Sequence, residues 1–290
     1  MSATAALDHT CAEFDEALLL DIVARLQAGE VIPYLGPAAL QLDAANLQIP
    51  SGPTALAQAL TRRVAVPSRI RHNLTAAAQY IENFRHRKTL RKLMLEAFAL
   101  PAQPGPLHVM LARLRRLPLL VDIGYDAASA IAFAGRLDWG QVQGISHAEG
   151  QGQWCAYYGS DGARVAEEIA DTWNTLIYKP LGSVSPAGNF LVSDSDLVEV
   201  LTEIDIQTPI PPIVRSLRSC RSFLFLGCRF DDQVARAYAR QIMKRSSKRH
   251  WAVFEQQPTR NELRFFAEQS IAVLPLPLGD FVSRLAPLLA

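Results

Sequence analysis

The sequence of 290 residues has few cysteines and none of the cysteine spacings that bind metal. Its four cysteines, Cys11, Cys155, Cys220 and Cys228, form no C-x-x-C pair. This excludes the usual four-cysteine zinc ribbon and argues against a disulfide framework. We therefore expect no zinc or other metal site, and we interpret the cysteines as small core residues of a protein in a reducing cytoplasm.

The sequence also lacks a long apolar run and an excess of charge of either sign. The formal net charge is +1, so no global field attracts nucleic acid or an acidic membrane. No apolar run reaches membrane-spanning length, and residues Met1–Glu16 lack the basic and apolar regions of a signal peptide. We expect a cytoplasmic protein without membrane or nucleic-acid partners.

Familiar catalytic motifs are missing as well. The sequence contains no H-E-x-x-H, no Ser-His-Asp order and no paired-carboxylate pattern. Three histidines, His108, His147 and His250, remain as candidate bases by residue type alone. The structural alternative for His108 is a hydrogen-bonded helix residue, and for His147 a solvated loop residue.

What the sequence does contain is a buried strand followed by small residues. Val31–Leu35 is an apolar run that ends at Gly36, and Pro37, Ala38 and Ala39 follow it. Small residues after such a strand let the backbone approach a bulky ligand, as dinucleotide sites require. No second glycine completes a G-x-G-x-x-G fingerprint, so an ordinary buried strand with a tight turn remains the alternative.

Hydrophobic periodicity predicts alternating helices and strands along most of the chain. The predicted strands are Val31–Leu35, Leu117–Gly124, Thr175–Gly182, Arg221–Gly227, His250–Phe254 and Ser270–Leu276. The predicted helices are Glu13–Gly29, Thr54–Ala65, Leu74–Leu100 (one or two), Leu107–Arg116, Val165–Trp173, Ser193–Leu201, Ile213–Leu217, Gln233–Lys244, Thr259–Gln269 and one from Asp280. The remaining stretches are interpreted as a loop over Gln41–Pro53, a linker over Pro101–Pro106 and a Gly- and Gln-rich variable excursion over Gly135–Gly162.

This alternation predicts an α/β fold with a Rossmann-like, doubly wound and mostly parallel sheet flanked by helices. We expect residues 1–290 to form a single domain, with residues 53–116 as a helical insertion or subdomain within it. In such sheets ligands bind beyond the carboxyl ends of the strands. Four glycines fall at predicted strand ends and outline one pocket if they converge: Gly36, Gly124, Gly182 and Gly227. Glycine at a strand end also simply permits a turn.

Two groups of charged residues have competing interpretations. A basic cluster over Arg85–Lys92 lies beside an apolar helix face, so we interpret it as the solvated side of that helix rather than a phosphate site. Asp231 or Asp232 is placed to cap the following helix, whose positive end offers a phosphate site. Asp126 is either a ligand contact or a helix cap.

Several short motifs, in their order and spacing, resemble the sirtuin-like domain family of bacteria, in its branch associated with NAD cleavage in phage defence. Val31–Leu40 resembles the first strand and Gly-Ala-Gly loop of that family, and Pro106–Ala112 resembles its Pro-x-His segment. Val121–Asp126 resembles the Thr-Thr-Asn-Tyr-Asp segment, and Tyr178–Ser183 the Lys-Leu-His-Gly-Ser segment. Val192–Asp196 and Phe223–Asp232 are similar to the Thr-x-x-Asp and Phe-Leu-Gly-x-x-x-Asp stretches.

This sequence departs from the family pattern at the positions that bind the ligand and catalyse the reaction in the family. The resemblance places Gly124 where the family has its Asn near the nicotinamide ribose, and Leu181 where it has the His that acts as a general base. Leucine neither accepts a proton nor orients a water molecule. Pro37 and Ala38 replace the Ala and second Gly of the first loop, and proline removes an N–H donor.

The resemblance therefore implies a nucleotide-binding module of the NAD or ADP-ribose type, or a partner-binding module, without NAD cleavage. The alternative is an NAD⁺ hydrolase of the bacterial defence type with a substituted catalytic residue; protein deacetylation is disfavoured because the zinc cysteines are absent. A weakly bound NAD or ADP-ribose and a protein partner or second copy of the chain are expected. The expected ligand-binding residues are Gly36, Pro37, Ala38, Tyr125, Asp126, Gly182, Gly227, Cys228 and Asp232.

Overall fold

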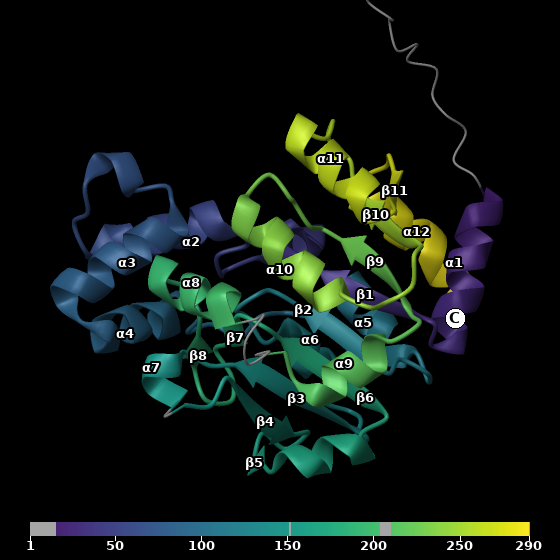
Figure 1. Ribbon diagram of the computed structural model, residues 1–290, viewed down its shortest axis with the longest axis horizontal. Helices are drawn as coiled ribbons and strands as arrows, with labels where there is room; N and C mark the ends of the chain where they lie inside the picture. The colour runs from purple at the N-terminus through teal and green to yellow at the C-terminus, as the bar shows by residue number, and fades with distance from the viewer. Residues whose placement is uncertain (1–15, 151, 204–209, 290) are drawn as a thin grey trace, which may run out of the picture.

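The computed structural model describes residues 16–150, 152–203 and 210–289, without the side chains of residues 43–46, 147 and 148. Its centre is a nine-stranded sheet in the order β11-β10-β9-β1-β2-β6-β3-β4-β5 (Figure 1). The strands from β11 to β3 pair in parallel, whereas β3–β4 and β4–β5 pair antiparallel. The strand bounds are β1 Val31–Leu35, β2 Leu119–Asp122, β3 Trp139–Gly144, β4 Cys155–Gly159, β5 Arg164–Val165, β6 Thr175–Lys179, β9 Ser222–Leu226, β10 His250–Val253 and β11 Ile271–Leu274. The Rossmann-like, mostly parallel α/β fold is confirmed.

Helices cover both faces of the sheet. One apolar layer joins α1, α5 and α12 to one face, and a second joins α8, α9, α10 and α11 to the other. The bounds of these helices and of the short α6 and α7 are α1 Glu16–Ala28, α5 Pro106–Arg113, α6 Ala128–Ala132, α7 His147–Gly150, α8 Asp194–Glu203, α9 Pro212–Arg218, α10 Gln233–Met243, α11 Arg260–Glu268 and α12 Leu278–Leu289. Strands buried on both faces explain the continuous apolar runs in the sequence.

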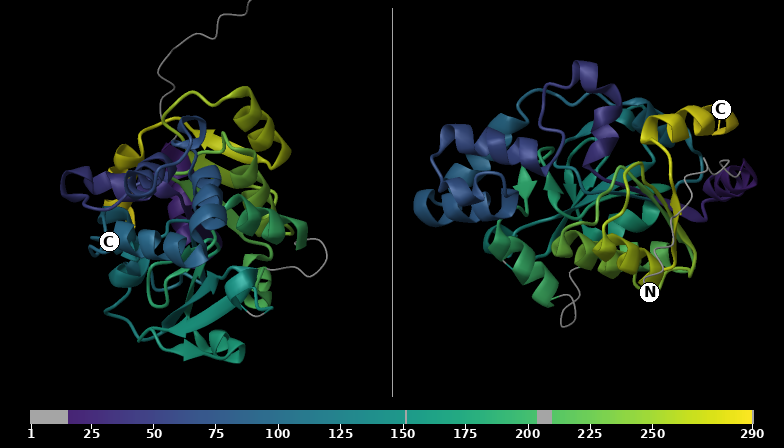
Figure 2. Two further views of the ribbon diagram at one scale, coloured as in Figure 1. Left: turned by 90° about the vertical axis from the view of Figure 1, so that its left-hand side faces the viewer. Right: turned by 90° about the horizontal axis from the view of Figure 1, so that it is seen from above.

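A third apolar cluster lies beyond the sheet, in the helices between β1 and β2. It joins α2 (Pro53–Arg63), α3 (Leu74–Arg85) and α4 (Arg87–Ala97), which pack against one another at one end of the molecule (Figure 2). Arg91 of α4 donates to the carbonyls of Ala187 and Gly188 in the turn of a small hairpin, β7 (Gly182–Ser183) and β8 (Asn189–Phe190). The helical cluster therefore lies next to the carboxyl ends of the strands.

Three sequence-based expectations about secondary structure are wrong. The excursion over 135–162 contains β3 and β4, and the polar residues Gln141 and Gln143 of β3 are buried and hydrogen-bonded to each other at 3.0 Å. Residues 165–173 form no α-helix: β5 ends at Val165, and a 3₁₀ helix, η3, spans Glu167–Thr172. Part of the loop expected over 41–53 belongs to the 3₁₀ helix η1, Pro37–Asn46.

Candidate functional site

The loops that follow β1, β2, β6 and β9 converge at the carboxyl edge of the sheet, as the sequence predicts. Gly36 N–H donates to Leu226 O at 2.9 Å, and Ile123 N–H donates to Leu35 O at 3.1 Å. Val184 N–H donates to Tyr125 O at 2.8 Å, which joins the β2 loop to the β6 loop. The chain leaves β1 towards β2 on one side and returns through β9 on the other, so this edge is the switch point of the sheet.

The loop after β1 has no free amide with which to hold a phosphate. Gly36 and Ala38 donate their N–H groups to Leu226 O and Gly227 O, at 2.9 and 3.1 Å, and Ala39 donates to Gly36 O at 3.0 Å. Pro37 has no N–H group. Of the four positions at which a phosphate cradle would offer backbone donors, three donate within the protein and the fourth has no donor.

The contact between the β1 and β9 loops is also too close for a ligand to pass between them. A Cβ atom built on Gly36 would lie 2.3 Å from Gly227 O and 2.6 Å from Cys228 Cα. Gly227 has a φ of +70°, and a Cβ built on it would lie 2.6 Å from Ala39 N. The two glycines are required for this backbone contact, independently of any ligand.

Beneath the loops after β2 and β6 lies a buried ion pair. Lys179 Nζ contacts Asp122 Oδ2 at 2.8 Å and donates to Asp126 O at 2.9 Å. Ser129 Oγ donates to Asp122 Oδ2 at 2.6 Å, and Gly124 N–H donates to Asp122 Oδ1 at 2.8 Å. Burial opposes the charged form of Asp122, but the Lys179 ammonium outweighs it and holds the pKa of this carboxyl below its usual value. This pair is part of the scaffold, because both side chains are fully enclosed.

Leu181 lies between β6 and β7, at the position where the family resemblance places the general base. Its side chain is half-buried and packs against the main apolar core, and its carbonyl accepts the N–H of Leu191 at 2.9 Å. Gly124 is half-buried, and a Cβ built there would lie 2.5 Å from Asp126 Oδ2. An asparagine at this position would therefore have to displace the Asp126 carboxylate.

The other predicted contacts have structural roles in this fold. Tyr125 donates its hydroxyl to Leu191 O at 2.8 Å, and burial raises its pKa. The Asp126 carboxylate accepts Ala128 N–H at 2.8 Å at the start of α6. Cys228 is enclosed, and burial raises the pKa of its thiol, so it is no nucleophile. Asp232 caps α10 by accepting Val234 N–H at 3.2 Å, which places a carboxylate at the helix end suggested for phosphate.

One of the candidate histidines is buried at this edge. His108 of α5 is enclosed near Asp122, Asp126 and Lys179, its Nδ1 atom is buried without a hydrogen-bond partner among the residues that the structure describes, and burial lowers its pKa. His250 begins β10, at the opposite edge of the sheet. The side chain of His147 lies outside the described residues, as does Cys11. Within the described chain, no group of three His, Cys, Asp or Glu residues could hold a metal ion.

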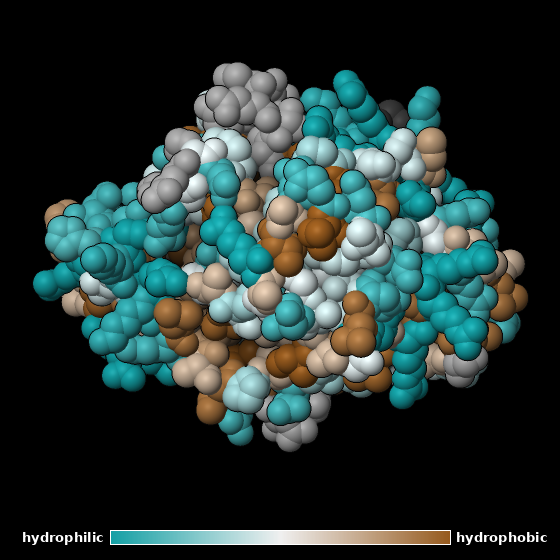
Figure 3. Space-filling view, turned by 90° about the horizontal axis from the view of Figure 1, so that it is seen from below, coloured by the Kyte–Doolittle hydropathy of each residue, from teal (hydrophilic) through white to brown (hydrophobic). Residues whose placement is uncertain are grey.

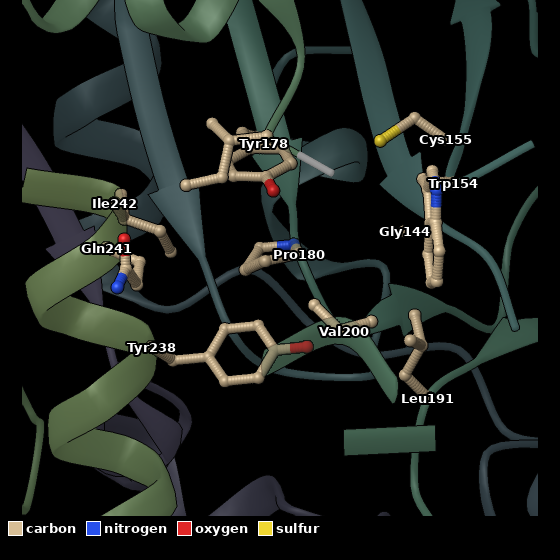
Figure 4. A pocket seen from close by; sticks show the side chains of 11 residues that line it. Gly144, Trp154, Cys155, Tyr178, Pro180, Leu191, Val200, Tyr238, Gln241 and Ile242 are labelled. Carbon is tan, nitrogen blue, oxygen red and sulfur yellow. The ribbon is translucent and has the colours of Figure 1, made fainter. Parts of the chain in front are cut away.

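A cavity next to Pro180, the residue before Leu181, is far smaller than a nucleotide. It lies between Pro180, Leu191 and the helices α8 and α10, with a volume of about 10 Å³, enough for about one water molecule (Figure 4). The hydroxyls of Tyr178 and Tyr238 lie around it, and the pKa of each is raised by burial. A larger hollow of about 410 Å³ follows β4 and β5, and none of the predicted binding residues lines it.

The comparisons with known proteins agree with this fold. A model of the SIR2-like domain family matches residues 120–274, from β2 to the end of β11 and more than half of the chain. The chain therefore belongs to the SIR2-like domain family, whose fold is that of a sirtuin-like nucleotide-binding module. A search of curated proteins found no match. No helix in the described part of the chain is both long and apolar enough to cross a membrane.

Proposed function

We propose that this protein is a sirtuin-like module that does not cleave NAD, binds NAD or ADP-ribose weakly at most, and acts through a protein partner or a second copy of the chain. The observation that carries the proposal is Leu181, an aliphatic side chain at the position of the family's general base. Cleavage of the nicotinamide–ribose bond followed by attack on the ribose needs a group that removes a proton, and leucine has none.

The phosphate end of the site supports the same proposal. The amides of Gly36, Ala38 and Ala39 already donate to backbone carbonyls, and Pro37 has no N–H group. A dinucleotide would have to break these hydrogen bonds before its pyrophosphate found donors. The residues present therefore do not fit NAD held in the family's manner, and we derive no step through it.

The test is incubation of the purified protein with NAD, with nicotinamide release followed by chromatography. We expect no release from the unmodified protein. Two variants accompany it: Leu181→His, which restores a base, and Leu181→Gln, which is polar but transfers no proton near neutral pH. Release by the unmodified protein contradicts the proposal and favours an NAD⁺ hydrolase with a substituted residue.

The variants separate loss of the base from loss of the site. Release by Leu181→His but not by Leu181→Gln means that the pocket survives and only the base is missing. If none of the three proteins releases nicotinamide, and millimolar ADP-ribose does not raise their melting temperatures, the carboxyl edge is closed to nucleotides. We expect neither nicotinamide release nor a rise in melting temperature, because the loop after β1 has no free backbone N–H group to bind phosphate.

A further inference from the structure

The amino ends of the central strands, opposite the carboxyl edge, form one continuous row of loops. Ser247 N–H, before β10, donates to Arg221 O, before β9, at 2.9 Å. Arg221 Nε donates to Gly29 O, before β1, at 2.8 Å. A Cβ built on Gly29 would lie 3.1 Å from Arg116 O, before β2. The four loops therefore lie side by side in the order of their strands, at the end of the molecule where α1 lies (Figure 1).

These loops and the ends of the helices before them carry many exposed positive charges. Six side chains, here called the edge cations, are exposed and form no ion pair with any residue that the structure describes: Arg113, Arg115, Arg116, Arg215, Arg245 and Lys248. Hydrophilic side chains predominate at the corresponding right-hand end of Figure 3, and hydrophobic ones gather nearer the middle of that face.

Four acidic residues along this edge are already paired with other arginines. Asp21 contacts Arg25 at 2.9 Å and Arg249 at 3.1 Å, and Glu30 contacts Arg25 at 3.3 Å. Further along the edge, Asp138 pairs with Arg136 and Glu268 with Arg240. The edge cations therefore keep their charge uncompensated by these carboxylates.

The buried Arg218, at the end of α9, lies near two of these cations. Burial is the main cause that lowers its pKa to about 10; Tyr178 opposes this shift, and the charges of Arg215 and Arg245 add to it. Arg215 and Arg245 therefore lie close enough to Arg218 for their charges to act on it.

Stabilisation of helix ends by positive charge explains the positions of only two of the six edge cations. Cations in the last turn of a helix interact favourably with its dipole, and Arg113 of α5 and Arg215 of α9 have that position. The other four edge cations lie beyond the helix ends, since α5 ends at Arg113 and α10 ends at Met243. Their position is explained better by an anionic partner.

We propose that the amino edge of the sheet binds the phosphate backbone of a nucleic acid. Four neighbouring strands span about 14 Å at the usual spacing, which is enough for several phosphates. Arginine predominates among the edge cations, and its planar guanidinium suits phosphate oxygens. Ser216, Ser219 and Ser246 lie close to these cations in the chain, and serine hydroxyls also donate to phosphate oxygens.

This inference is independent of NAD chemistry, because it concerns the opposite edge of the sheet. The net charge of +1 gave no reason to expect nucleic acid, but a whole-chain sum averages over a fold that gathers cations at one edge. The distribution of charge, rather than its total, carries the proposal.

The test measures the binding of a fluorescent 30-base-pair DNA duplex and of a single strand of equal length by anisotropy, at several salt concentrations. The variant combines Arg115→Gln, Arg116→Gln, Arg215→Gln and Lys248→Gln. We expect its affinity at low salt to fall at least tenfold, and its slope of log affinity against log salt to decrease by about 2–4, since each phosphate contact contributes about 0.9.

A matched control removes the same number and kind of exposed charges from the helical cluster: Arg62→Gln, Arg69→Gln, Arg71→Gln and Lys88→Gln. Melting temperatures confirm that both variants are folded. Equal loss of affinity in the two variants, or no binding of either nucleic acid by the unmodified protein, overturns the proposal. Binding to vesicles of phosphatidylglycerol without binding to nucleic acid also overturns it, in favour of a membrane surface.

Discussion

Gly36 shows how one residue can serve packing rather than a ligand. We expect Gly36→Ala to lower the free energy of unfolding by about 2–4 kcal/mol, because the added methyl group would meet Gly227 O at 2.3 Å, a backbone atom that cannot swing away. The measurement is urea denaturation. Gly52→Ala is the control, since its Cβ would meet only Pro37 Cβ at 3.8 Å, and it should change stability by less than about 1 kcal/mol. Equal effects of the two substitutions would contradict this account of the loop.

The buried pair Lys179–Asp122 leads to a second prediction for single residues. Asp122→Asn should cost about 3–5 kcal/mol of unfolding free energy, because it leaves the enclosed ammonium without its counter-charge. The exposed pair Arg240–Glu268 provides the comparison, and Glu268→Gln should cost less than about 1 kcal/mol. Both are measured by chemical denaturation at pH 7. A small loss for Asp122→Asn would mean that Lys179 reaches solvent.

At the scale of elements, a strand could be predicted from the sequence where its buried residues are apolar. All six strands predicted from apolar runs form, since β1, β2, β6 and β9–β11 consist mainly of aliphatic and aromatic residues. β3 was missed because Gln141 and Gln143 occupy buried positions, and it is their mutual hydrogen bond and that from Asn189 that make burial tolerable. The hydropathy of a segment does not show that a residue far away in the chain, such as Asn189, will form hydrogen bonds with its buried polar side chains.

The pairing of β9 with β10 gives a pH-dependent prediction. His250 Nδ1 accepts Phe223 N–H at 2.9 Å, and burial lowers the pKa of this imidazole to about 4. Between pH 6.5 and pH 4 the unfolded chain takes up a proton that the folded chain does not, so the free energy of unfolding should fall by about 2 kcal/mol as the pH decreases through this range.

The variant His250→Asn isolates this contribution to acid sensitivity. Its amide oxygen can still accept Phe223 N–H but does not titrate, so we expect a flatter dependence of unfolding free energy on pH between 6.5 and 4. His72→Asn, at an exposed position, should leave the profile unchanged. An unaltered profile in His250→Asn would show that other groups set the acid sensitivity.

At the scale of the whole molecule, Arg87 at the start of α4 is one of the residues that attach the helical cluster α2–α4 to the loops beyond β6. Arg87 contacts Asp196 Oδ2 at 2.7 Å, beyond β8, and Asp196 also accepts the N–H groups of Val192 and Ser193. We expect Arg87→Met to speed cleavage within α2–α4 by thermolysin under native conditions, because detachment exposes this segment. Arg85→Met, at an exposed neighbouring position, is the control and should be cleaved at the original rate.

The place of the candidate site could be predicted from the sequence, but the internal hydrogen bonds that occupy its backbone N–H groups could not. Glycines at strand ends predicted the convergence of Gly36 and Gly227, because parallel strands bring their carboxyl ends to one edge. That the amides after β1 donate to β9 depends on the register of two strands far apart in the chain, which no residue pattern encodes. The resemblance of separate motifs nevertheless predicted the family that the match to residues 120–274 confirms.

The place of β1 at the centre of the sheet also bears on how the chain folds. Its partner β9 comes late: Cys228, which follows β9, contacts the carbonyl of Tyr34 at a separation of 194 residues. The edge of β1 that pairs with β9 therefore stays unpaired until β9 has been synthesised, and such non-local pairing slows folding. An unpaired edge of the apolar run Val31–Leu35 favours association with other chains during that interval.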